Sequence, residues 1–225
     1  MQIEGLRGSE KDVIVFHLLF ACACAVVLLL PVGMAAGVRL IILVIGYNVL
    51  LPAVGIIRSR PEWLVLWRFV FFLSLFQVFP DRFLAEVLGV LVFPEDGCFT
   101  FGAVSGYMAG LWAIPLFLVI FIAGVIEERG FPKIAPWVAA AVALVIFGTS
   151  EETLWLLGSW YAQDVLMIDH AAVYILIPEM ILGLAAFLMY RQVRRRSWLH
   201  ALGGAFLTML VYLGAAGLFY LLIEG

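Results

Sequence analysis

Carboxylic acids inside apolar segments are the residues of this chain that point most plainly to chemistry. Glu179 directly follows Pro178, and apolar residues flank the pair on both sides. Glu151 and Glu152 stand before another apolar run, and Asp81 ends a long one. Carboxyl groups are costly to place in an apolar medium, so each is a candidate for function. The candidate catalytic residues are therefore Glu179, Glu151, Glu152 and Asp81.

Aromatic side chains accompany these acids and suggest what they would act on. A protonated carboxyl group can donate its proton to an alkene or an epoxide, and aromatic faces can stabilise the carbocation that forms. An isoprenoid or another long lipid, entering sideways from a membrane, would be the substrate. The candidate substrate-binding residues are Trp155, Trp160, Tyr174, Tyr107, Trp112 and Arg39.

The segment from Trp160 to Met180 carries a resemblance to a known group of enzymes. Trp160 is followed downstream by Ile177-Pro178-Glu179-Met180. This resembles integral-membrane terpene and lycopene cyclases, in which a Trp-containing segment precedes a Pro-Leu-Glu-Glu motif. The chain departs from that motif because Met180 stands where the second glutamate would be. The resemblance implies a small seven-span membrane enzyme in which Glu179 inherits the acid role.

Each of these residues also has a plainer interpretation. Glu151 and Glu152 could mark the point where a helix reaches water, and Asp81 could pair with Arg82 at an interface. The tryptophans could form the aromatic belt at the lipid headgroups. A metal site built from Glu151, Asp164, His170 and Glu179 is a further alternative, although the chain has no HxxxH or ExxH spacing. We expect neither a metal nor another cofactor.

Two other classes of function remain open. Buried carboxyl groups can serve as proton or ion sites in a small transporter. A non-catalytic subunit or scaffold, packed against partner chains, pigments or further copies of itself, would also suit the many Phe and Trp residues. The net charge of −3 gives no basic surface for nucleic acid.

The composition predicts the setting of these residues. Hydrophobic residues make up 65% of the 225 residues and charged residues only 13%, whereas soluble domains are about 45–50% apolar and about 25% charged. The chain is therefore an integral membrane protein, and we expect one transmembrane domain over residues 1–225 without a soluble domain. The first apolar run lacks a small-residue cleavage site, so we expect it to be retained as a helix.

Seven segments are long and apolar enough to cross a bilayer, which predicts an all-α helix bundle. Because proline breaks a helix interior, we expect the third segment to end before Pro80 and a short interfacial helix to occupy residues 80–93. The seven segments are residues 13–34, 38–57, 63–79, 103–125, 134–157, 171–190 and 198–223.

The loops predict the orientation of the bundle. Three connections carry Lys or Arg, and the run from Arg191 to Arg196 is the most basic of them. The alternate connections carry acids such as Glu95 and Asp164 but no Lys or Arg. Because basic loops stay in the cytoplasm, the N-terminus is expected on the cytoplasmic side. The membrane is expected to be a bacterial inner membrane. The carboxylates and aromatics then gather in the outer half of the bundle.

Overall fold

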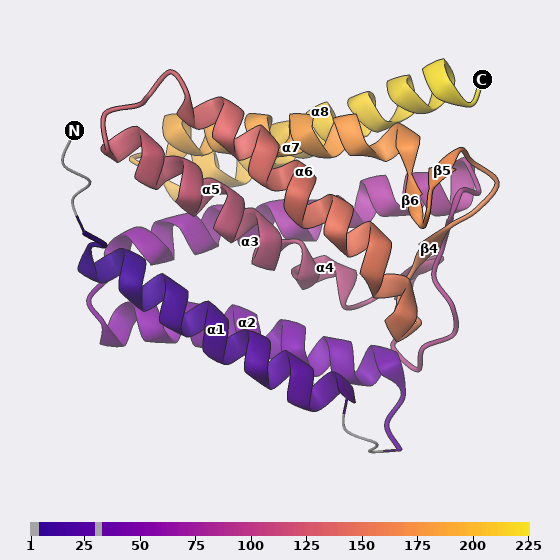
Figure 1. Cartoon of the computed structure of the whole chain (residues 1–225), viewed down its shortest axis with the longest axis horizontal. Coiled ribbons are helices and arrows are strands. Elements are labelled where there is room, and N and C mark those ends of the chain that lie inside the picture. The colour runs from indigo at the N-terminus through magenta and orange to yellow at the C-terminus, as the bar shows by residue number, and fades with distance from the viewer. Residues whose placement is uncertain (1–4, 30–32) are drawn as a thin grey trace.

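A computed structural model of the chain describes residues 5–29 and 33–225. Over these residues the fold is an all-α bundle in which seven helices are long and apolar enough to cross a membrane (Figure 1). The spans are α1 (Gly8–Leu29), α2 (Ala36–Ile57), α3 (Pro61–Arg82) with the π-helical turn η1 (Phe83–Val87), α4 (Met108–Leu111) with α5 (Ala113–Glu128), α6 (Ala135–Thr153) with the 3-10 turn η2 (Leu154–Leu157), α7 (Val173–Val193) and α8 (Trp198–Ile223). The predicted fold class is confirmed.

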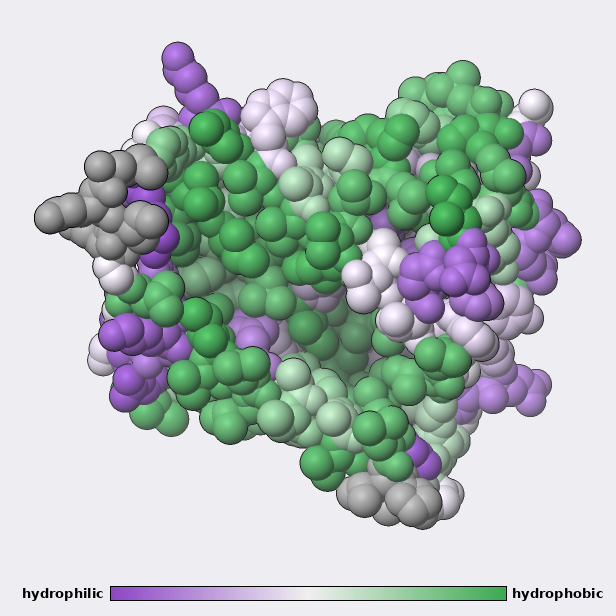
Figure 2. All heavy atoms as spheres, in the orientation of Figure 1, coloured by the Kyte–Doolittle hydropathy of each residue, from purple (hydrophilic) through white to green (hydrophobic). Residues whose placement is uncertain are grey.

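Large apolar side chains cover the outside of the bundle. Leu19 of α1, Ile57 of α2, Trp137 of α6 and Leu221 of α8 are each more than two-thirds exposed. Figure 2 shows this surface as a hydrophobic band, with hydrophilic residues gathered at the two ends of the bundle. Exposed apolar area of this extent needs lipid around it, as expected for an integral membrane protein.

The structure corrects the expected helix break at Pro80. α3 continues through Pro80 to Arg82 and then widens into η1, where the Leu88 N–H donates to the Phe83 carbonyl over 3.1 Å. No separate helix occupies residues 80–93 within the described chain, and residues Leu91–Val92 form the strand β1. Proline is tolerated in membrane helices because local π adjustments provide new partners for the freed backbone groups. Asp81 therefore lies inside the third span.

A second irregularity divides the fourth span at Trp112. The Pro115 nitrogen has no hydrogen to donate to the carbonyl one turn earlier, that of Leu111, so the regular helix hydrogen bonding is interrupted here. α4 ends at Leu111 and α5 begins at Ala113. Trp112, at the junction, is buried among the helices.

Three short antiparallel strand pairs lie at one end of the bundle, which we call the hairpin end (Figure 1). β1 pairs with β4 (Tyr161–Ala162), β2 (Thr100–Phe101) with β3 (Val104–Ser105), and β5 (Met167–Ile168) with β6 (Ala171–Ala172). The pairing of β1 with β4 joins the connection after α3 to the connection after α6. This strand pair lies over the ends of the helices, and we call it the β1–β4 roof.

The opposite end, which we call the charged end, holds salt bridges between helices. Arg129 at the end of α5 contacts Glu10 of α1 over 2.6 Å, and Arg191 of α7 contacts Glu127 of α5 over 3.1 Å. Most of the remaining packing involves α7, which lies against α6 and α8, and α3, which lies against α8. By contrast, α1 packs mainly against α2 and buries only Glu10 and Val13.

Candidate active site

A cavity of about 250 Å³ lies inside the bundle beneath the β1–β4 roof. Its walls come from α3, α4, α5, α6, α7 and α8, with Leu91 and Ala162 supplied by the roof. Most of the lining is apolar or aromatic, but three carboxyl groups also reach it: Asp81, Glu151 and Glu179. The structure thus brings together three of the four candidate catalytic residues, each from a different helix.

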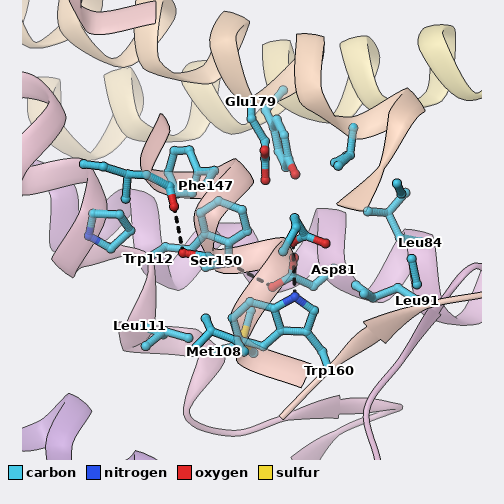
Figure 3. Close-up of a pocket in the computed structure, with 18 of the residues that line it drawn as sticks. Asp81, Leu84, Leu91, Met108, Leu111, Trp112, Phe147, Ser150, Trp160 and Glu179 are labelled. Carbon is cyan, nitrogen blue, oxygen red and sulfur yellow. Dashed lines mark hydrogen bonds between the residues drawn. The ribbon is translucent and has the colours of Figure 1, made fainter. Parts of the chain in front are cut away.

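Asp81 is held by the tryptophan at the junction of α4 and α5. The Trp112 indole Nε1 donates a hydrogen bond to Asp81 Oδ2 over 3.1 Å, and Asp81 is only 2% exposed (Figure 3). The continuous helix through Pro80 makes this contact possible because it carries Asp81 into the bundle interior. The alternative pairing with Arg82 does not occur, since the Arg82 guanidinium contacts Glu86 over 2.6 Å instead.

Glu151 is held in the same way by the tryptophan that precedes β4. The Trp160 Nε1 donates to Glu151 Oε1 over 3.2 Å, and both residues line the cavity. The neighbouring Glu152 points elsewhere. Its two carboxylate oxygens accept the backbone N–H groups of His170 and Ala171 at 3.2 and 3.0 Å. Glu152 therefore fastens the β5–β6 hairpin to α6 and contributes nothing to the cavity lining.

Glu179 lacks the indole partner that the other two acids have. It is 2% exposed, and its Oε2 atom has no hydrogen-bond partner among the described residues. Figure 3 shows its side chain reaching from α7 towards the part of the cavity that holds Asp81 and Trp160. Buried polar atoms are rarely left unpaired, and such an atom often marks a place where a ligand or water completes the set.

Aromatic rings form the wall around the acids. Trp112 lies edge-on to Tyr212 of α8, with ring centroids 5.7 Å apart, and also packs on Phe147 of α6 at 5.1 Å. Tyr174 also lines the cavity, as expected. Sequence reasoning missed Tyr212 and Phe147. Tyr212 could have been noticed as a polar ring within the apolar run of the seventh span.

Three of the proposed substrate-binding residues lie outside the cavity. The Tyr107 hydroxyl donates to the Ser159 carbonyl over 3.0 Å, and burial raises the pKa of this phenol above its usual range. Trp155 packs on His170 with ring centroids 4.1 Å apart and donates from its indole Nε1 to the Glu152 carbonyl. Arg39 donates to the backbone carbonyls of Met34 and Leu28 near the start of α2. These contacts assign all three side chains to holding loops and helix ends.

The four residues of the alternative metal site do not come together in the structure. Asp164 and His170 do not line the cavity with Glu151 and Glu179. Among residues 5–29 and 33–225, no group of three or more His, Cys, Asp or Glu side chains is close enough to hold a metal ion. The three acids therefore surround the cavity rather than converge on one point.

Residues 78–223 match the model of a family described as a domain of unknown function, DUF6989. The chain belongs to this family. The matched region begins just before Asp81 and contains every residue that lines the cavity, whereas α1 and α2 precede it. No match was found among curated proteins or among solved structures.

Proposed function

We propose that the cavity binds an unsaturated lipid of the isoprenoid class and rearranges it, by cyclisation or isomerisation, through proton transfer from a carboxyl group. One observation carries the proposal. Three carboxyl groups line a single apolar, aromatic-walled cavity inside a membrane bundle, and only Glu179 lacks an indole donor. An apolar cavity with a few convergent polar groups is the usual form of a small-molecule site.

Glu179 is the proton donor in this scheme. Its carboxyl O–H bond breaks, and the proton adds to one carbon of an alkene, whose π electrons form the new C–H bond. The other alkene carbon becomes a cation. A second double bond of the same molecule can then attack the cation and close a ring. The pocket is lined mainly by apolar groups, so little water is present to capture the cation first.

The other two acids and the rings serve the later steps. A carboxylate at Asp81 or Glu151 faces the developing positive charge and is an acceptor for the proton that the final cation loses. The indole N–H groups of Trp112 and Trp160 keep those oxygens in place. The faces of Tyr212 and Phe147 add cation–π attraction, which contributes about 0.5–2 kcal/mol per ring. The products differ from the substrate only in the arrangement of bonds, so no oxidant, reductant or cofactor is consumed.

The proposed setting is the outer half of a bacterial inner membrane. The charged end of the bundle carries Arg129 and Arg191, and the hairpin end above the cavity carries acidic loops. If basic loops face the cytoplasm, the cavity opens in the half of the membrane away from it. A lipid can reach this depth without leaving the bilayer.

Lipids that copurify with the protein test the proposal. Wild type, Glu179→Gln and Glu95→Gln are purified in mild detergent, and their organic extracts are compared by mass spectrometry. Glu95 is exposed on a loop and does not line the cavity, so its variant is a matched control. We expect Glu179→Gln to accumulate an acyclic or unrearranged lipid whose isomer is found in the other two. Identical extracts of bulk phospholipid from all three proteins would contradict the proposal.

The scaffold and transporter hypotheses remain predictions. The same variants distinguish them from the enzyme. Loss of a copurifying protein chain on mutation of Glu179, with the lipid extract unchanged, would favour a scaffold. A change in proton or ion flux across vesicles, again without a change in the lipid, would favour a transporter.

A further inference from the structure

A long apolar groove runs along the outside of the bundle between α1 and α5. It has a volume of about 760 Å³. Ile14, Leu18 and Phe20 of α1 form one side, and Phe121 and Ile122 of α5 form the other. The face drawn in Figure 2 is hollowed in its middle, and the side chains around the hollow are mostly hydrophobic.

The groove adjoins the carboxylate cavity. Ile114 and Leu118 of α5 line both spaces. Residues four apart lie on one face of a helix, so Ile114, Leu118 and Ile122 form a row that leads from the cavity into the groove. The row continues to Ile126, and at 1.5 Å per residue it covers about 18 Å.

The polar group in the middle of the groove is already satisfied by the protein. His17 contacts the Val13 carbonyl through Nδ1 at 2.8 Å, so Nδ1 carries the hydrogen and donates it. Its Nε2 atom then accepts from the Tyr47 hydroxyl at 3.1 Å. The ring also stacks on Phe117 of α5. His17 therefore presents only its ring to the groove, which suits a hydrocarbon occupant.

We propose that this groove holds the hydrocarbon tail of the lipid whose reactive end lies in the carboxylate cavity. The inference rests on the proposed function and adds to it that the substrate is a long-chain lipid that enters between α1 and α5. A partner helix, about 10 Å wide with its side chains, could cover the groove but could not continue past Leu118 into a cavity of about 250 Å³. A flexible chain can do both.

The weak attachment of α1 is consistent with such an entrance. Leu18, which lines the groove, is 62% exposed, and α1 packs mainly against α2, with individual side-chain contacts to α5 such as that of His17 with Phe117. Near its start α1 is tied to α5 by the Glu10–Arg129 salt bridge. A lipid tail can therefore pass sideways from the bilayer and lie along α5 without displacing a packed helix.

Photo-crosslinking tests this inference separately from the chemistry. The probe is an all-trans polyprenol with a diazirine at its tail end, added to vesicles that contain the whole protein. We expect labelled peptides from α1 and α5, with label on groove residues such as Cys24 and Ile122. Label distributed evenly over the exposed faces of α2 and α8 would overturn the proposal.

Two blocking variants and one control sharpen the result. Leu118→Trp should obstruct the junction, and Ile122→Trp, at a partly exposed position that is easier to accommodate, should fill the groove itself. In each, groove labelling should fall about tenfold, the scale on which a pocket rejects added bulk. Ile45→Trp, on the exposed face of α2, should leave it unchanged. Unchanged labelling in both blocking variants would also overturn the proposal.

The Glu179→Gln variant distinguishes the two proposals. It should keep the groove label, because the tail site does not involve the acid. Groove labelling in a protein that rearranges no lipid would leave the tail site standing and remove the acid chemistry. Lipid rearrangement by a protein that shows no label on α1 or α5 would leave the acid chemistry standing and remove the tail site.

Discussion

Trp112 Nε1 lies 3.1 Å from Asp81 Oδ2 and donates a hydrogen bond to it inside the bundle. Trp112 lies at the junction of α4 and α5, three residues before Pro115, and Asp81 lies in α3, which continues through Pro80. Trp160 and Glu151 repeat the arrangement at 3.2 Å. Two carboxyl groups thus have fixed orientations before any ligand arrives, which is the preorganisation that catalytic sites need.

Trp112→Phe tests that arrangement. The ring is kept but the N–H donor is lost, so the buried Asp81 carboxyl group loses its indole partner at a cost of about 1–3 kcal/mol. We expect a lower thermal unfolding midpoint in detergent and a fall in lipid rearrangement on the order of tenfold or more. Trp137→Phe, at a position on α6 that is 69% exposed, is the control and should change neither. Equal behaviour of the two variants would show that the Trp112 hydrogen bond does not matter.

Glu151→Gln and Glu152→Gln should have different effects although the residues are adjacent. The first changes a cavity-lining acid, so lipid rearrangement should fall while the hairpin end stays folded. The second weakens the acceptors for the His170 and Ala171 backbone N–H groups, at a cost of about 1 kcal/mol. Hydrogen exchange of those two amides should therefore speed up only in Glu152→Gln. The reverse pattern would mean that the assignment of Glu151 to the cavity is mistaken.

Gly183→Ala should destabilise the bundle. A Cβ atom at this position of α7 would collide with Ala143 and lie 2.7 Å from the Ala139 carbonyl oxygen. Overpacking of this kind costs about 1–3 kcal/mol, so the thermal unfolding midpoint should fall. Gly214→Ala on α8 is the matched control, because a Cβ atom there meets nothing within 4 Å. If the two variants melted at the same temperature, the close packing of α6 on α7 would be contradicted.

Cysteine labelling in intact cells tests the orientation of the chain. In a background in which the three free cysteines, Cys22, Cys24 and Cys98, are replaced by serine, Glu95→Cys lies at the hairpin end and Lys133→Cys in the exposed loop between α5 and α6 at the charged end. A membrane-impermeant maleimide should label the first in intact cells and the second only after the membrane is permeabilised. The opposite result would invert the bundle and place the cavity in the cytoplasmic half.

The seven spans were predictable because length and hydropathy alone set them. The prediction that the helix breaks at Pro80 was wrong. The rule that proline breaks a helix interior does not include tertiary packing or a π-helical turn, which allow the helix to continue through the proline. As a result the continuous helix places Asp81 within hydrogen-bond distance of Trp112. From the sequence, the acids could be expected only to lie at a similar depth in the membrane. That they line one cavity could not be predicted.

The choice between Glu151 and Glu152 needed the structure. Residues adjacent on a helix are about 100° apart, so one of the two had to face away, but the sequence does not say which. Tyr212 was missed for a similar reason. The rotation of α8 about its own axis follows from its packing on α3 and α7, and an almost uniformly apolar helix carries no pattern that reveals it.

Proton transfer to carbon can be followed with an isotope. Wild type and Glu179→Gln are equilibrated in D₂O and incubated with the lipid that accumulates on the variant, and the products are analysed by mass spectrometry. Proton donation by Glu179 puts deuterium from its exchanged carboxyl group into a stable C–H position. We expect a rearranged product that carries one deuterium with wild type and none with Glu179→Gln. Lipid that wild type returns unrearranged and without deuterium would contradict acid catalysis in this cavity.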